Sequence, residues 1–222
     1  MAALIPKQES AYSLSNIVVY EYTKERSVVE ILLYHGTMDI YADNIARSGI
    51  SLQKSKPYLD FGPGFYTTPE RSFAVNTAEN RAKRYNKFSR IRMPRNPAIV
   101  IFECDNERLN LLSHKYFSSP SDVWGRFVLA NRITNDSIRQ STEHNCDHRF
   151  DCVVGPTADG KSGAIDTLVE LIDSGKVPLS KIRTYSIIPS RHLNWGIQYS
   201  FHTSAALACL KLRDVQYILP RR

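Results

Sequence analysis

Phe61-Gly62-Pro63-Gly64-Phe65-Tyr66-Thr67-Thr68 is the segment on which the prediction of the fold depends most. Its two glycines allow the chain to turn tightly before a short strand that runs through Tyr66. Two other segments complete the pattern: Tyr34-His35-Gly36-Thr37 ends an apolar run, and Gln198-Tyr199-Ser200-Phe201-His202 lies late in the chain. Because these segments are far apart in the sequence, only folding can bring them together.

The residues around Tyr34-His35-Gly36-Thr37 predict a strand, a tight turn and a helix. The run 28–35 is apolar and rich in β-branched residues, as in a buried strand. From 39 to 48 the apolar residues follow helical spacing, and Gly49 stands where a glycine commonly ends a helix. After the glycine loop, Thr68 suits the N-cap of a second helix that runs into a basic segment.

The rest of the chain mixes strands and helices without a regular alternation of the two. Strands are expected at 98–103, 150–154, 182–188, 197–202 and 215–219. Helices are expected at 122–132, 164–174 and 203–209, and 133–149 is expected to be a loop. This order favours an α+β fold over a doubly wound parallel sheet.

Length and composition are those of an ordinary globular protein. With 222 residues, of which 42% are hydrophobic and 23% charged, one domain with added segments is expected. No apolar stretch approaches the roughly 20 residues of a membrane-spanning helix, so no membrane association is expected. The first 27 residues are mixed in character and are expected to be peripheral to a domain of residues 28–222.

The start of the chain and its cysteines favour a cytoplasmic location. The first residues contain neither a basic n-region nor an apolar h-region of useful length, so no secretory signal is expected. Cys104, Cys152 and Cys209 stand in apolar surroundings, which suits buried free thiols better than disulfides, and Cys146 forms no tight pattern with them. A reducing compartment fits this usage.

The net charge of +7 is concentrated in one segment. Residues 81–95 include no acidic residue and seven basic ones: Arg81, Lys83, Arg84, Lys87, Arg90, Arg92 and Arg95. Tyr85 and Phe88 are interleaved with them, a composition typical of a nucleic-acid contact in which cations bind phosphates and rings stack on bases. A solvated basic helix end explains the segment equally well.

Residues 155–162, Gly-Pro-Thr-Ala-Asp-Gly-Lys-Ser, match the pattern of a phosphate loop between a predicted strand and a predicted helix. Pro156 removes one backbone donor from such a loop, and no later predicted strand ends in an Asp that could hold magnesium. A structural turn is therefore favoured, and a P-loop nucleotide-binding protein remains the minor alternative.

His144, Cys146 and His148 alternate as metal ligands sometimes do. There is no convincing fourth ligand and no paired motif, so a polar loop is the favoured interpretation. No metal is expected.

The three segments quoted first are arranged as in ADP-ribosyltransferases of the diphtheria toxin and poly(ADP-ribose) polymerase type, which this chain resembles from about Leu32 to Leu210. It looks most similar to a bacterial toxin-like group that shares the DFGxGFY loop, the Val-Gly-Pro-x-Ala-Asp stretch and the Gln-Tyr-x-Phe-His-Thr strand. The resemblance implies a split β-sandwich of two small sheets flanked by helices, with a cleft for NAD between the sheets.

The resemblance also implies roles for single residues. Gly36 would approach the nicotinamide carboxamide closely, with Thr37 adding a hydroxyl and His35 holding a ribose hydroxyl. Tyr66 would stack on the cationic nicotinamide ring, beside a loop formed by Gly62, Gly64 and Phe65. NAD would be the substrate and no metal would be needed.

Gln198 stands where this family usually has a carboxylate that stabilises an oxocarbenium-like transition state. An amide can orient the ribose 2′-hydroxyl, but it supplies neither a full negative charge nor a base. A nucleophile that is already good, such as a nucleobase nitrogen, would need such a base less.

The loop before the last catalytic strand faces the acceptor in this family, and here it contains Arg191, His192, Asn194 and Trp195. Trp can stack on a base, Asn can read a base edge and Arg can hold phosphate, so this loop and the basic residues Arg81, Arg84 and Arg90 predict a nucleic-acid acceptor, RNA more than duplex DNA. An enzyme that modifies RNA in its own cytoplasm implies a neutralising antitoxin protein, in a toxin–antitoxin or anti-phage system. A protein-modifying transferase and a non-catalytic module that binds NAD or RNA remain alternatives.

Overall fold

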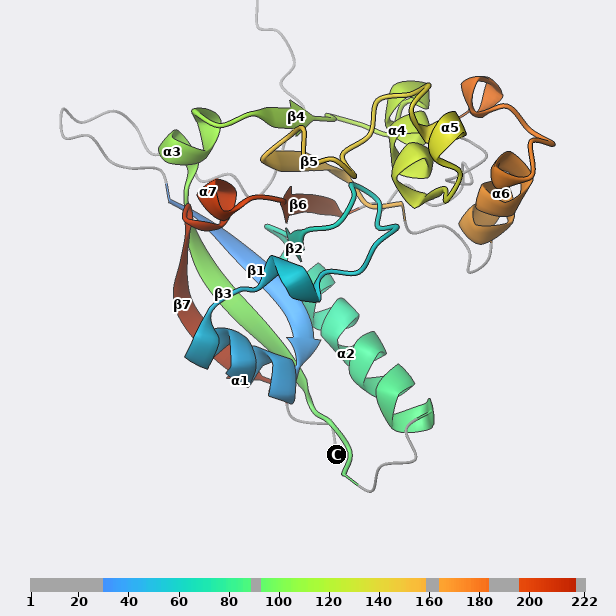
Figure 1. The fold of residues 1–222 in the computed structure, drawn as a ribbon. Helices are drawn as coiled ribbons and strands as arrows, with labels where there is room; N and C mark the ends of the chain where they lie inside the picture. Colours follow the sequence, from blue (N-terminus) through green and yellow to red (C-terminus); the bar gives the residue numbers. More distant parts are fainter. Residues whose placement is uncertain (1–29, 89–92, 159–163, 184–195, 219–222) are drawn as a thin grey trace, which may run out of the picture.

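The computed structural model describes residues 30–88, 93–158, 164–183 and 196–218. Within these ranges the chain forms two small β-sheets with helices packed around them, so the predicted α+β class is confirmed (Figure 1). Several predicted features lie outside the described residues: the segment 1–27, residues 159–162 of the phosphate-loop pattern, residues 184–188 of the strand predicted at 182–188, Arg90, Arg191, His192, Asn194 and Trp195.

The first sheet is antiparallel and has the strand order β1-β3-β7. Its strands are β1 (Glu30–Met38), β3 (Pro97–Asp105) and β7 (Leu210–Tyr217). Both faces of β3 are buried, because Ile99 and Ile101 pack against helix α2 (Arg71–Phe88) while Val100 and Phe102 face the second sheet. Burial on both faces explains why β3 is a continuous apolar run rather than an alternating one.

The second sheet has the strand order β2-β6-β5-β4, with β4 and β5 parallel and the other neighbours antiparallel. Its strands are β2 (Phe65–Thr67), β6 (Ile197–Phe201), β5 (Cys152–Pro156) and β4 (His114–Tyr116). Phe65 and Phe201 on one face pack against the first sheet, and Val153 on the other face packs against helix α4 (Asp122–Arg132). The sheets therefore share one core, and the second sheet shares another with α4.

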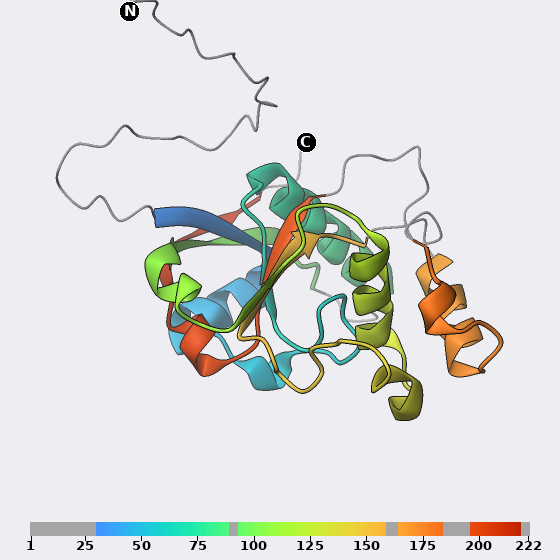
Figure 2. The ribbon, with the colours of Figure 1, turned by 90° about the horizontal axis from the view of Figure 1, so that it is seen from above.

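Helix α1 packs against the first sheet, and α4, α5 and α6 are grouped at the end farther from β7 (Figures 1 and 2). The bounds of the remaining helices are α1 (Asp39–Ser48), α3 (Asn106–Asn110), α5 (Asp136–Arg139), α6 (Ala164–Asp173) and α7 (Ser204–Leu207), with 3-10 turns η1 (Leu52–Lys54) and η2 (Leu179–Lys181). In the part of the chain that the structure describes, no helix combines the length and the apolar character needed to cross a bilayer.

The helices predicted at 39–48 and 122–132 are confirmed with those bounds. Gly49 ends α1 with φ +75° and donates its N–H to the Ile45 carbonyl, and the Ser121 hydroxyl caps α4 by accepting from the Trp124 N–H. Cys104, Cys152 and Cys209 are buried free thiols, as predicted. Burial raises the pKa of the Cys104 thiol to about 12.

Some local predictions are wrong. Ile182 and Arg183 are not strand residues; Ile182 is apolar because it packs into the core after η2. The expected loop at 133–149 contains α5, and β7 begins at Leu210 instead of at 215. Neither α3 nor β4 was predicted. Strand β4 was missed because His114 and Tyr116 are exposed on an edge strand, so its sequence has no apolar pattern.

Candidate functional site

Strands β1 and β2 meet at one residue pair and then diverge. Tyr34 and Thr68 exchange two backbone hydrogen bonds of 2.8 and 2.9 Å, and this is the bridge between β1 and β2 within the described residues. In the same antiparallel register the next such pair would be Gly36 with Tyr66. Instead β1 follows the first sheet and β2 follows the second, so the two sheets separate between Gly36 and Tyr66. We call this place the split.

Side chains satisfy the backbone carbonyls that the split leaves without a strand partner. The Tyr66 carbonyl accepts from His35 Nδ1 over 2.6 Å, and the Gly36 carbonyl accepts from an Arg81 guanidinium nitrogen over 3.1 Å. Because Tyr34 directs both its N–H and its C=O towards Thr68, the N–H of Gly36, two residues on, points in the same direction. The split therefore presents a backbone donor beside an imidazole and a guanidinium.

His35 is held in one tautomer. A carbonyl oxygen can only accept, so the bond to Tyr66 places the proton on Nδ1 and leaves Nε2 as an acceptor in the neutral ring. Burial, and then the positive charge of Arg81, lower the pKa of His35 to about 4. The ring stacks on Phe65 with 4.5 Å between ring centroids. At neutral pH His35 can accept a hydrogen bond from a hydroxyl group.

Gly36 is required by the packing of α2 on β1. A Cβ added at Gly36 would lie 2.1 Å from the carbonyl oxygen of Ala74 and 3.1 Å from the backbone nitrogen of Ala78. Two small residues of α2 thus bring that helix directly onto β1, and Arg81 follows on the same helix. The glycine allows the approach that delivers Arg81 to the split.

The hydroxyl of Tyr66 holds the glycine loop closed. It donates to the Gly62 carbonyl over 2.6 Å and accepts from the Phe61 N–H over 3.0 Å. Burial and the negative charge of Asp60 raise the pKa of Tyr66 well above 10, so the phenol stays protonated. Gly62 has φ +87°, a conformation that disfavours any residue with a side chain.

His202, which directly follows β6, anchors the same loop. Its Nδ1 donates to the Pro63 carbonyl over 2.7 Å, and its Nε2 lies 2.8 Å from the Ser200 hydroxyl. Burial lowers the pKa of His202 to about 4. A Cβ added at Gly64 would lie 2.7 Å from the His202 ring, so glycine and histidine fit only as a pair.

Gln198 is bound to a carboxylate that the sequence pattern did not identify. Its Nε2 donates to Asp60 Oδ2 over 3.0 Å, and the Ala158 N–H donates to the same oxygen over 3.1 Å. The other oxygen of Asp60 accepts two hydrogen bonds from the Arg132 guanidinium, one of them 2.8 Å long. Both carboxylate oxygens are thus occupied and the charge is paired, so Asp60 orients the Gln198 amide and is not a free base.

The signature residues converge, but on two sides of β2. Tyr66 pairs with Ser200, so its side chain shares a face of the second sheet with Gln198. His35 stacks on Phe65, which belongs to the opposite face. The side chain of Thr37 is buried. Across the split, His35 therefore reaches Tyr66 through the backbone of β2 and not through its ring.

Of the predicted substrate-binding residues, Arg81 lies at the split and Arg84 is exposed one turn further along α2. Burial lowers the pKa of Arg81, which still leaves it charged at neutral pH. The others lie outside the described residues, so the basic surface described here belongs to α2.

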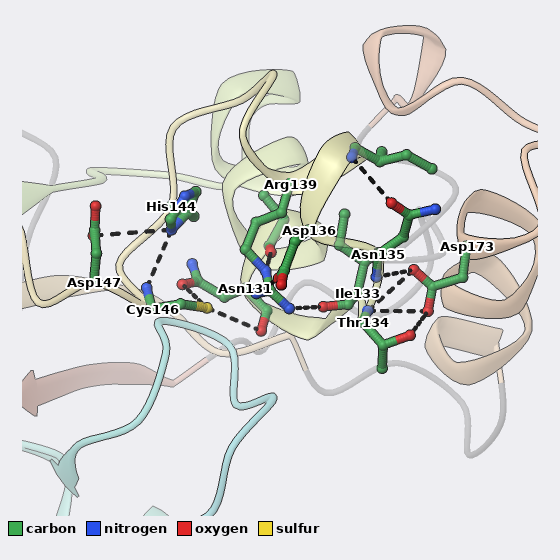
Figure 3. Close-up of polar contacts among 12 residues, drawn as sticks. Asn131, Ile133, Thr134, Asn135, Asp136, Arg139, His144, Cys146, Asp147 and Asp173 are labelled. Atoms are coloured by element: carbon green, nitrogen blue, oxygen red, sulfur yellow. Dashed lines mark hydrogen bonds and ion pairs between the residues drawn. The ribbon is translucent and has the colours of Figure 1, made fainter.

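Helix α4 and the loop that follows it pack against the glycine loop through two buried asparagines. Asn131 receives the Asn145 N–H on its Oδ1 over 2.7 Å and donates to the Phe127 carbonyl over 2.9 Å. A Cβ added at Gly62 would meet both asparagines. The Cys146 thiol also bonds to Asn131, which holds it away from His144 (Figure 3). Among the described residues no group of three or more His, Cys, Asp or Glu side chains could hold a metal ion.

The larger hollow described on the surface, of about 470 Å³, lies beside this loop and is lined by residues 140–144, Asp147 and Arg149. It does not reach the split. Its lining is mainly polar and carries charges of both signs, which suits a flat apolar ring poorly.

Sequence reasoning assigned no role in this site to Asp60, Arg132 or His202. Asp60 lies in the motif DFGxGFY directly before the glycine loop, so the sequence shows its position but not its bond to Gln198. Arg132 ends α4 and carries no local signal at all. Only the contact between the loop, α4 and β6 identifies these residues.

Comparison with known proteins gives one match. The model of the family described as "Protein of unknown function (DUF3990)" matches residues 31–212. No curated protein and no solved structure gave a significant match.

Proposed function

We propose that this chain, which belongs to the family described as "Protein of unknown function (DUF3990)", is an NAD-dependent mono-ADP-ribosyltransferase that modifies a nucleobase in RNA or single-stranded DNA. The split between β1 and β2 is the observation that carries the proposal. It gathers a backbone donor at Gly36, a neutral imidazole acceptor at His35 and the ordered glycine loop at Tyr66. These three groups suit, in turn, the carboxamide, a ribose hydroxyl and the flat nicotinamide ring of NAD.

In this proposal the resemblance supplies the roles, and the geometry supports those of Gly36, His35 and Gln198. The Gly36 N–H would bind the nicotinamide carboxamide, with the Thr37 hydroxyl beside it, and His35 Nε2 would accept from a ribose hydroxyl. The carboxylate of Asp60 fixes the amide nitrogen of Gln198, which leaves the Gln198 oxygen as an acceptor for the 2′-hydroxyl. The Tyr66 ring would stack on nicotinamide while its hydroxyl keeps the loop closed.

The reaction would break the bond between nicotinamide N1 and ribose C1′. The bonding electrons leave with nicotinamide, which becomes neutral, and a lone pair of a base nitrogen forms the new bond to C1′. A proton lost from that nitrogen goes to water. Because Gln198 carries no charge and Asp60 is paired with Arg132, the site offers no strong base, which favours a nucleophile that needs none.

The exposed basic side of α2 supports a nucleic-acid acceptor. Lys83, Arg84 and Lys87 are exposed and continue from Arg81, which already lies at the split. A single nucleic-acid strand whose phosphates bind these cations would place its bases near the split. The proposal extends to a toxin or anti-phage role in the cytoplasm, in which a protein antitoxin neutralises the enzyme.

Transfer of label from NAD tests the proposal. The protein is incubated with NAD labelled in its adenylate half and with RNA, single-stranded DNA, duplex DNA or cell protein, and the acceptor that takes up label is identified. We expect RNA to be labelled, and His35→Ala to reduce labelling about 100-fold. His148→Asn is the matched control, because His148 is exposed and Asn tolerates its positive φ.

Other outcomes select the alternatives. Label in protein alone supports a protein-modifying transferase, and bound but intact NAD with every acceptor supports a non-catalytic module. Activity that is lost in Lys161→Ala but retained in His35→Ala supports a P-loop nucleotide-binding protein. Gly155 and Pro156, the first residues of that pattern, belong to β5, and a Cβ at Gly155 would lie 3.0 Å from Phe117.

A further inference from the structure

One row of side chains crosses the second sheet on the face opposite to Tyr66 and Gln198. Thr67, Tyr199, Val154 and Tyr116 are direct neighbours on β2, β6, β5 and β4. Paired residues of adjacent strands point to the same face. The first sheet covers the Thr67 end of this row, whereas Tyr116, at the other end, is 64% exposed.

The open end of this row forms the floor and walls of a pocket of about 340 Å³. Helix α3 closes it from one side. The pocket is lined by Asn106, Leu109, Asn110, His114, Tyr116, Cys152, Val154 and Tyr199. None of these side chains carries a fixed charge, so the pocket suits an uncharged group.

The strand spacing between the two tyrosines matches the room that a flat ring would need between them. Tyr116 and Tyr199 stand on either side of Val154, two strand spacings apart, which is about 10 Å between their backbones. A flat ring stacked between two others needs ring centroids about 5 Å away on each side. Val154, which is 8% exposed, supplies an apolar floor for the edge of such a ring.

Polar side chains at the rim of the pocket can form hydrogen bonds to the edge of a bound ring. Asn106 and Asn110 are four residues apart and share one face of α3. Within the described part of the chain, neither amide is hydrogen-bonded, and the Tyr199 hydroxyl has no partner although its ring is mostly buried. Asn110 is exposed, and Asn106 and Tyr199 are half-buried, so these polar groups can bond to a ligand at the rim of the pocket.

We propose that this pocket binds a nucleobase, held between Tyr116 and Tyr199 and recognised by the side chains of Asn106 and Asn110. Stacking of a base between aromatic rings with amide contacts to its edge is a common mode of single-strand recognition. The base belongs either to a free nucleotide or to a single-stranded RNA. The pocket lies on the opposite face of the sheet from Gln198, and the proposal does not rest on the transferase activity.

Isothermal titration of the full chain tests the pocket, with the four ribonucleoside monophosphates in one arm and ten-nucleotide single-base RNAs in the other, at one salt concentration. We expect at least one base to bind, and Tyr116→Ala and Asn110→Ala to weaken its binding, the first about 10-fold. Both side chains are exposed, so neither substitution removes core contacts, and thermal unfolding checks this. Tyr41→Ala, at an exposed tyrosine of α1, is the matched control.

The two arms distinguish the sources of the base. Monophosphates that bind as tightly as the RNAs assign the pocket to a free nucleotide, and RNAs that bind at least 10-fold more tightly, with the same loss in Tyr116→Ala, assign it to a strand. Equal affinity of Tyr116→Ala and Tyr41→Ala for every ligand would show that the basic helix α2, not the pocket, binds the RNA and would overturn the proposal. Absence of binding in both arms would overturn it too.

Discussion

The side-chain amide of Gln198 donates a 3.0 Å hydrogen bond to the carboxylate of Asp60, 138 residues earlier in the chain. The bond joins β6 to the glycine loop. Since Arg132 binds the other oxygen of Asp60, three distant segments meet at one buried carboxylate. The amide of Gln198 is thus itself held in place by a carboxylate.

Removal of the charge at Asp60 should destabilise the fold. Asp60→Asn leaves the partly buried Arg132 guanidinium without its counter-ion, and we expect the free energy of unfolding to fall by about 3 kcal/mol. Urea unfolding measures the change. Asp136→Asn breaks the more exposed pair with Arg139 and should cost less than about 1 kcal/mol. Equal losses in the two variants would show that Asp60 is not a buried anchor.

Introduction of a carboxylate at position 198 should lower the free energy of unfolding at high pH. In Gln198→Glu two carboxylates face each other, so the pKa of the pair rises above that of the unfolded chain. A raised folded pKa makes the variant most stable below the unfolded pKa and less stable as pH rises. We expect a loss of about 1–2 kcal/mol at pH 8 that disappears near pH 4.

Urea unfolding across this pH range measures the effect of Gln198→Glu. Gln140→Glu, at an exposed position, is the control and should match the parent protein at every pH. A Gln198→Glu variant as stable as the parent at pH 8 would mean that the two side chains do not face each other in solution.

A side chain at Gly36 should separate α2 from β1. Gly36→Ala places a methyl group 2.1 Å from the Ala74 carbonyl oxygen, and we expect it to cost about 2–3 kcal/mol of unfolding free energy. Gly175→Ala is the control: its φ is +72° but nothing lies within 4 Å of the added Cβ, so only backbone strain of about 1 kcal/mol applies. Thermal unfolding ranks the two. A smaller cost for Gly36→Ala would contradict the packing described here.

The two buried histidines should make stability depend on pH. His35 and His202 have folded pKa values of about 4 against 6.5 when unfolded, so the unfolded chain binds more protons between these values. Their contribution is complete above pH 6.5 and is lost as pH falls towards 4. Each histidine should add up to about 1.4 kcal/mol per pH unit to the slope in that window.

Replacement of one histidine isolates its share of that slope. His202→Gln should flatten the dependence of unfolding free energy on pH between 4 and 6.5, while His114→Gln, at an exposed position, should leave it unchanged. An unaltered slope in His202→Gln would show that His202 has the same pKa in the folded and the unfolded protein.

Much of the local structure followed from the sequence. The cap at Ser121 and the glycine after α1 were predictable because the bonds they make join residues at most four positions apart. Of the strand predicted at 182–188, residues 184–188 lie outside the described residues; at Ile182 the prediction was wrong because an apolar run looks the same in a strand and in a core turn. Likewise, β4 was missed because an exposed edge strand carries no apolar pattern.

The candidate site also has features that the sequence predicts and features that only the tertiary structure shows. The sequence by itself determined many of the elements, the caps at Ser121 and Gly49, the need for glycine at 62 and the chemical types of His35, Tyr66 and Gln198. Tertiary structure alone decided that β1 and β2 part after Tyr34 and Thr68, that Gly36 admits α2, and that Asp60 holds Gln198. The physical reason is that helix caps and turns are bonds between near neighbours, whereas a buried carboxylate finds its partners in space, and sequence spacing carries no trace of them.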